Sequence, residues 1–112
     1  MKKLILGAIA IVAVTTAANK PPYKLHVPSD PNATYTVLEI GAKGNLATII
    51  TKREGKSGTT YSQRAYDCSA KKVMYLGSGE TLGDMHSSKP DDHLSPIVGG
   101  SIADYVGNEA CS

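Results

Sequence analysis

Two histidines and two aspartates stand close together in the segment between residues 86 and 93. Imidazole nitrogens and carboxylate oxygens are common metal ligands, so His86, Asp91, Asp92 and His93 are the candidates for a metal site. Their spacing fits neither one face of a helix nor a zinc-binding motif, and polar loops are generally rich in these residue types. The sequence therefore predicts no metal and no other cofactor.

The chain shows no residue pattern that is typical of an active site. Hydrolytic mechanisms need a nucleophile beside a base, or two carboxylates at a suitable separation. The sequence contains neither arrangement, and its 112 residues leave room for one small domain. We therefore predict a non-enzymatic protein. A small enzyme or metal-binding protein that uses the four residues above is the alternative.

Cys68 and Cys111 are the two cysteines of the chain. An even number of cysteines in an oxidising compartment indicates disulfide bonding, and the N-terminal segment described below indicates export. The predicted Cys68–Cys111 bridge closes a loop of 43 residues. The chain-entropy model gives such a bridge a stabilising effect of about 4 kcal/mol. A bridge between two chains is the alternative, whereas the spacing does not support a two-thiol metal site.

The aromatic residues are six tyrosines, with no tryptophan and no phenylalanine. Tyr61, Tyr66 and Tyr75 fall on predicted strands, as does Arg64. Because Tyr61 and Tyr66 are five residues apart, they should face opposite sides of a sheet, one in the core and one exposed. An exposed strand tyrosine is a suitable contact for a protein partner. These four residues are the predicted partner-binding set, and ordinary half-buried sheet residues are the alternative.

Runs of β-branched and aromatic residues predict the sheet that must position these side chains. The runs cover residues 34–40, 46–52, 59–68 and 72–77, and the second and third should form a hairpin. Four prolines in residues 19–33 predict an extended arm with at most an edge strand at 23–27. The predicted class is α+β: a small antiparallel sheet of about four strands, covered by a C-terminal helix and stapled by one disulfide. The single domain covers residues 34–112.

The covering helix is predicted over residues 101–111. Ser101 is a good N-cap and Asp104 stands in the first turn, where the helix dipole favours an acidic group. Gly107 costs about 1 kcal/mol inside a helix, so Cys111 should hold the helix end through the disulfide. One apolar stripe is formed by Ile102, Tyr105, Val106 and Ala110. Residues 77–100 resemble a loop, in which Thr81, Leu82 and Met85 extend the fourth strand or form a short turn.

The first 18 residues have the pattern of a secretory signal peptide. Lys2 and Lys3 precede an apolar run of 11 residues, and small residues follow at the expected cleavage site after Ala17 or Ala18. A membrane-spanning helix needs about 20 apolar residues, so we expect no span after cleavage. Removal of the segment takes away two lysines and leaves ten basic against ten acidic side chains. This balance gives no support for nucleic-acid binding.

The chain from about residue 34 to residue 111 resembles the surface-adhesin E family of small exported Gram-negative proteins. The residues that carry the resemblance are Arg64-Ala65-Tyr66-Asp67-Cys68, Tyr75, Pro90, Ser95-Pro96-Ile97, Gly100-Ser101 and Cys111. The resemblance implies an antiparallel sheet with a helix, the Cys68–Cys111 bridge, and adhesion to host extracellular-matrix or serum proteins. The sequence lacks the lipidation cysteine of the best-known family member.

We therefore expect an exported, non-enzymatic protein-binding domain of the adhesin type, located in the periplasm, at the cell surface or in the medium. A periplasmic inhibitor that resembles the small lysozyme inhibitors, with a lysozyme-like enzyme as its partner, is the alternative. An accessory component of the envelope is a further one. A dimer could form by pairing of edge strands or through an apolar sheet face.

Overall fold

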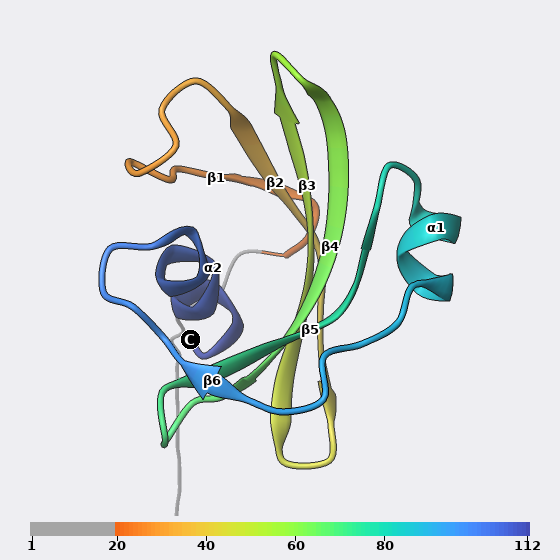
Figure 1. Cartoon of the computed structure of the whole chain (residues 1–112). Helices are drawn as coiled ribbons and strands as arrows, with labels where there is room; N and C mark the ends of the chain where they lie inside the picture. The colour runs from red at the N-terminus through yellow and green to blue at the C-terminus, as the bar shows by residue number, and fades with distance from the viewer. Residues whose placement is uncertain (1–19) are drawn as a thin grey trace, which may run out of the picture.

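The computed structural model describes residues 20–112, so the predicted signal peptide lies outside the described residues. This part of the chain forms one antiparallel sheet of six strands in sequence order, with a helix on each face (Figure 1). No helix within it is long and apolar enough to cross a membrane. The elements are β1 (Tyr23–Leu25), β2 (Thr34–Lys43), β3 (Leu46–Gly55), β4 (Gly58–Asp67), β5 (Lys72–Gly79), α1 (Leu82–Ser87), β6 (Ser95–Pro96) and α2 (Ile102–Ala110).

The α+β class, the antiparallel sheet, the C-terminal helix and the disulfide are confirmed, but the predicted number of strands is wrong. The four predicted strands correspond to β2–β5, and β3 and β4 form the expected hairpin. The two additional strands are short edges, since β1 pairs three residues with β2 and β6 pairs two with β5. β1 falls within residues 23–27, where the sequence allowed an edge strand, whereas β6 lies in the segment that was expected to be a loop.

The apolar core lies between the sheet and α2. Val37, Ile49 and Tyr66 come from β2, β3 and β4, and they pack against Val106 and Ala110 of the helix. We call the sheet face that carries them the inner face. Ser101 caps α2 as predicted, because its side chain accepts a hydrogen bond from the backbone N–H of Asp104.

Gly107 is what allows α2 to approach the sheet. A Cβ atom at this position would lie 2.6 Å from Cε2 of Tyr66, closer than packed carbon atoms approach. The Tyr66 hydroxyl donates a hydrogen bond of 2.7 Å to the carbonyl oxygen of Ala103 in the same helix. The glycine that lowers the intrinsic helix propensity is therefore required by the packing.

The disulfide joins the end of β4 to the end of α2. The Cα atoms of Cys68 and Cys111 are 5.8 Å apart, and both residues are exposed. Because α2 has nine residues, it is shorter than the helices of about 12–15 residues that become stable on their own. The bridge therefore fixes the C-terminal end of the helix against the sheet.

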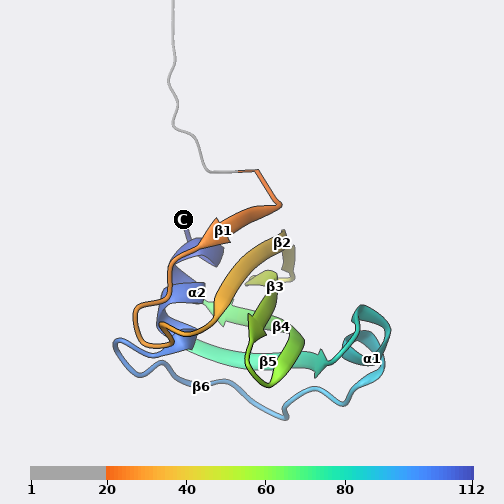
Figure 2. The same ribbon diagram turned by 90° about the horizontal axis from the view of Figure 1, so that it is seen from above.

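α1 covers the opposite, outer face of the sheet near the end of β5 (Figure 2). Met85 is its buried residue, and Thr81 caps the helix. The backbone of α1 comes so close that a Cβ atom on Gly79 would lie 2.7 Å from the Met85 nitrogen. The segment that was expected to be a loop, with an extension of the fourth strand or a short turn, thus contains a short helix that packs closely against Gly77 and Gly79 of β5.

Candidate functional site

The inner face changes from apolar to polar beyond the N-terminal end of α2. Alternate side chains of a strand point to the same face, and along β3 the inward series passes from Ile49 in the core to Thr51 and then Arg53. On the neighbouring strand β4 the corresponding series passes from Tyr66 to Arg64. The sheet therefore places two arginines where the covering helix no longer excludes water.

These polar side chains surround a small cavity of about 150 Å³. Ile102, the first residue of α2, closes it on the side of the core. Arg53 and Arg64 supply its two positive charges. Its remaining walls carry hydroxyl groups from the four central strands: Tyr35, Thr51, Thr60, Ser62 and Tyr75. We call this cavity the Arg64 pocket.

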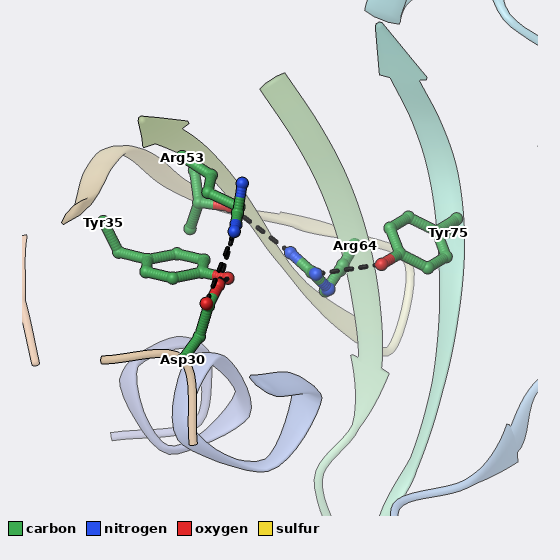
Figure 3. Close-up of polar contacts among 6 residues, drawn as sticks. Asp30, Tyr35, Arg53, Arg64 and Tyr75 are labelled. Atoms are coloured by element: carbon green, nitrogen blue, oxygen red, sulfur yellow. Dashed lines mark hydrogen bonds and ion pairs between the residues drawn. The ribbon is translucent and has the colours of Figure 1, made fainter. Parts of the chain in front are cut away.

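Arg64 is buried with neutral partners. Its side chain is 5% exposed, Nη1 donates to the Thr51 hydroxyl at 3.3 Å and Nη2 donates to the Tyr75 hydroxyl at 2.9 Å (Figure 3). The guanidinium carbon also lies 4.7 Å from the centre of the Tyr75 ring. Within residues 20–112, Nε has no hydrogen-bond partner and no carboxylate forms an ion pair with the group. Arginine stays charged in proteins, so this environment favours an incoming anion.

Arg53 is bonded to a carboxylate in the same region. Its Nε donates to Oδ2 of Asp30 at 2.7 Å, and its Nη2 donates to Oδ1 at 3.3 Å. The Tyr35 hydroxyl donates to the same Oδ2 at 2.7 Å. The hydrogen bonds from Arg53 and Tyr35 hold the pKa of Asp30 below its usual value. Burial, followed by the bond to Asp30, raises the pKa of Tyr35 to about 12. The charge of Arg53 is therefore balanced by an ionised carboxylate.

The four predicted partner-binding residues do not form one surface. Tyr75 is 41% exposed and stands at the pocket beside Arg64, so these two are brought together. Tyr61 is half-buried on the outer face, with its ring centre 5.9 Å from Nζ of Lys52. Tyr66 is fully buried in the core and is not available to a partner. Tyr61 and Tyr66 thus face opposite sides, as their spacing predicts.

The four candidate metal ligands do not converge on one point, although Asp91, Asp92 and His93 line one surface depression. His86 is exposed on α1, and Asp92 and His93 are exposed in the following loop. Asp91 is bonded to β5, because it accepts from the Tyr75 backbone nitrogen at 3.0 Å and its own N–H donates to the Tyr75 carbonyl at 2.9 Å. In the described part of the chain, no group of three or more possible ligand residues is close enough to hold a metal ion.

A larger cavity of about 300 Å³ lies beside the disulfide. Lys71, Ile97 and Asp104 are among its lining residues. Neither Lys71 nor Asp104 is buried. In residues 20–112, the buried polar side-chain atom that lacks a hydrogen-bond partner is Nε of Arg64, which lies at the other cavity. The Arg64 pocket is therefore the better candidate site, although it is the smaller cavity.

Sequence reasoning identified Arg64 and Tyr75 but did not identify Asp30, Tyr35, Thr51 and Arg53. The alternation on β3 carried a signal, since Thr51 and Arg53 continue the inward series that begins at Ile49. Nothing in the sequence indicated the role of Asp30, because this residue lies in the proline-rich segment and reaches Arg53 through the tertiary fold.

Comparison with protein-family models, with curated proteins and with solved structures gave no match.

Proposed function

We propose that this chain is an exported, non-enzymatic domain that binds another protein, and that the Arg64 pocket with Tyr75 is its binding site. The observation that carries the proposal is the buried guanidinium of Arg64, which is bonded to the neutral hydroxyls of Thr51 and Tyr75. Burial of a charge without a counter-charge is unfavourable. A partner that brings the counter-charge supplies a reason for its presence.

The residue types around the pocket suit a protein interface. Arginine and tyrosine are enriched among the residues that dominate binding energy in such interfaces. The exposed ring of Tyr75 lies beside the recess that contains Arg64. Cavities for drug-sized ligands usually measure about 300–1,000 Å³. The Arg64 pocket, with about 150 Å³, is better suited to a single side chain of a partner.

Two further observations support export and a class of partner. The disulfide joins two exposed cysteines, and such bonds persist in oxidising compartments. The resemblance to the surface-adhesin E family points to host extracellular-matrix or serum proteins.

Binding to a panel of immobilised, purified matrix and serum proteins tests the proposal. We expect saturable binding at micromolar concentrations by the disulfide-bonded chain. Arg64→Gln and Tyr75→Ala should each weaken it by about tenfold, as expected for loss of a charge-assisted bond or of an aromatic contact at an interface. Lys52→Gln removes a partly exposed charge from the outer face and should leave binding within about twofold, because this side chain does not line the pocket.

Two results would contradict the proposal. One is that the parent chain shows no saturable binding, and the other is that the parent and its three variants bind equally well. Urea unfolding of each variant separates a binding defect from a folding defect, and Tyr75→Ala needs this measurement because it also removes the hydroxyl that accepts from Nη2 of Arg64. A lysozyme assay with and without the chain addresses the alternative partner. Inhibition that persists in both pocket variants would assign the function to another surface.

A further inference from the structure

We propose that the Arg64 pocket receives one carboxylate group, presented by an acidic side chain or by the C-terminus of a protein. This inference rests on the proposed function, and it specifies the chemical group that enters the site. Three properties of the pocket carry it: its charge, its hydrogen-bond donors and its volume.

The charge of the pocket suits a single negative charge. Arg53 is ion-paired to Asp30 at 2.7 Å, so these two groups balance each other. Arg64 adds one positive charge, and in residues 20–112 no carboxylate lies within ion-pair distance of it. A carboxylate carries one negative charge, whereas a phosphate monoester carries about −1.5 to −2 at neutral pH. The second charge of a phosphate would have no cation to balance it, because Arg53 is already paired with Asp30.

The donors of the pocket suit the two oxygens of a carboxylate. Nε of Arg64 is buried and has no acceptor among the described residues, so a carboxylate reaches it when the side chains that cover it shift. Arginine–carboxylate pairs are commonly joined by two parallel N–H···O bonds. The hydroxyls of Thr60 and Ser62 line the same cavity and are further donors that an anion can use.

The size and the apolar walls of the pocket suit a carboxylate on a short hydrocarbon chain. A volume of about 150 Å³ admits a group of a few heavy atoms. Ile102 and the ring of Tyr75 border the cavity and provide contact for methylene groups. A glutamate side chain has this combination of an acidic end and an apolar stem.

NMR titration of the ¹⁵N-labelled, disulfide-bonded chain tests the inference at the atom that carries it. The probes are sodium acetate, N-acetylglutamate α-amide for an acidic side chain, N-acetylglycine for a C-terminus, and inorganic phosphate and sulfate, all at constant ionic strength. The readout is the Nε–H resonance of Arg64, assigned by its loss in Arg64→Gln. The Nε–H of Arg53 is the comparison within the same pocket, because it already donates to Asp30.

We expect a saturable shift of the Arg64 Nε–H with the carboxylate probes that is larger than the shift of the Arg53 Nε–H. The affinity for N-acetylglutamate α-amide or N-acetylglycine should exceed that for phosphate and sulfate by about tenfold, the factor that 1.4 kcal/mol represents. The tighter of the two probes identifies a side chain or a C-terminus as the source. Lys52→Gln should titrate like the parent chain.

Absence of a saturable Arg64 shift with every carboxylate, or tighter binding of phosphate or sulfate, would overturn the inference. The outcome is separable from that of the proposed function. Carboxylate binding at Arg64 without any bound protein would support the pocket and contradict the protein-binding proposal. Protein binding that is lost in Arg64→Gln, without a carboxylate response, would contradict the inference alone.

Discussion

Arg53 and Arg64 lie on neighbouring strands and point to the same face of the sheet, but their guanidinium groups have different kinds of partner. Arg53 is partly exposed and is bonded twice to the carboxylate of Asp30. Arg64 is buried and is bonded to two neutral hydroxyls. The first arrangement ties the segment before β2 to the sheet, so the structure accounts for the charge of Arg53. The second leaves the charge of Arg64 without a carboxylate partner within residues 20–112.

The same division is visible along the inner face as a whole. Under α2 the side chains are apolar and closely packed, as the contact of Gly107 with Tyr66 shows. Beyond Ile102 they are polar and surround the Arg64 pocket. Departures from an apolar core are expected at functional sites, where stability is given up for another purpose. The predictions below test whether the apolar half carries the stability and the polar half does not.

Removal of the disulfide should have the largest effect on the apolar half. Replacement of Cys68 and Cys111 by alanine opens a loop of 43 residues. We expect the free energy of unfolding to fall by about 4 kcal/mol, because the unfolded chain gains the entropy of that loop. Urea unfolding of the double variant and the oxidised parent measures the difference. A loss below about 1 kcal/mol would show that α2 is held by its packing alone.

Ile49→Ala should destabilise the fold by about 3 kcal/mol. The side chain is fully buried under α2, so the change removes apolar contact and leaves a cavity. Ser62→Ala lies on the next strand and the same face, but at the polar pocket. Its effect should stay within about 0.5 kcal/mol. Similar losses for the two variants, measured by urea unfolding, would remove the distinction between the halves.

Gly107→Ala should destabilise the fold by up to about 2 kcal/mol, the cost of overpacking less the gain in helix propensity. Alanine improves the helix propensity by about 1 kcal/mol, but its Cβ would meet the Tyr66 ring at 2.6 Å, and overpacking usually costs about 1–3 kcal/mol. Asn108→Ala is the control, since the neighbouring residue is exposed and gains only the propensity. Thermal unfolding followed by circular dichroism compares the two. An increase in stability for both would mean that the helix and Tyr66 are not in close contact.

The smallest expected effect concerns acid stability and separates the two arginines. The folded-state pKa of Asp30 is lowered from 3.8, first by the hydrogen bond from Arg53 and then by that from Tyr35. The stability that this carboxylate contributes is therefore present above about pH 4 and is lost as the pH falls through its lowered folded-state pKa. Asp30→Asn should make the melting temperature less dependent on pH below 4 than in the parent.

Asp67 has a lowered pKa as well, through bonds from Ala70 and Ser69, and it should retain part of the acid dependence in both proteins. The Arg64→Gln variant should keep the acid dependence of the parent, because Arg64 is bonded to neutral groups. A flattened profile in Arg64→Gln would reveal a carboxylate partner for this residue.

The sequence predicted those parts of the fold that depend on local pattern. The β-branched runs of β2–β5, the Ser101 cap with its apolar stripe, and the cysteine pair each have a physical cause within a few residues. α1 was not predicted, because Met85 is its one buried residue and its place is created by close contact with β5. The edge strand β1 lies where the sequence allowed one, at residues 23–27, whereas β6 has too few residues to form a pattern.

The candidate site was predicted in part, for a similar reason. The resemblance and the strand pattern selected Arg64 and Tyr75, and the structure places them in contact. Tyr66 has the same residue type but lies under α2, which its position on the strand alone does not reveal. The assignment of Asp30 to Arg53 rather than to Arg64 is decided by the tertiary path of the segment before β2. The local sequence pattern does not show which arginine Asp30 pairs with.

The stability of Arg64→Met in sodium acetate and in sodium chloride of equal ionic strength tests the central claim most directly. If Arg64 serves a carboxylate, the variant should unfold in chloride within about 1 kcal/mol of the parent or at higher urea, since apolar replacement of a buried charge is often neutral or stabilising. Acetate should then stabilise the parent alone, because a ligand stabilises only the state that binds it. A loss of about 3 kcal/mol or more in chloride, or equal stabilisation of both proteins by acetate, would contradict the account and make Arg64 a structural residue.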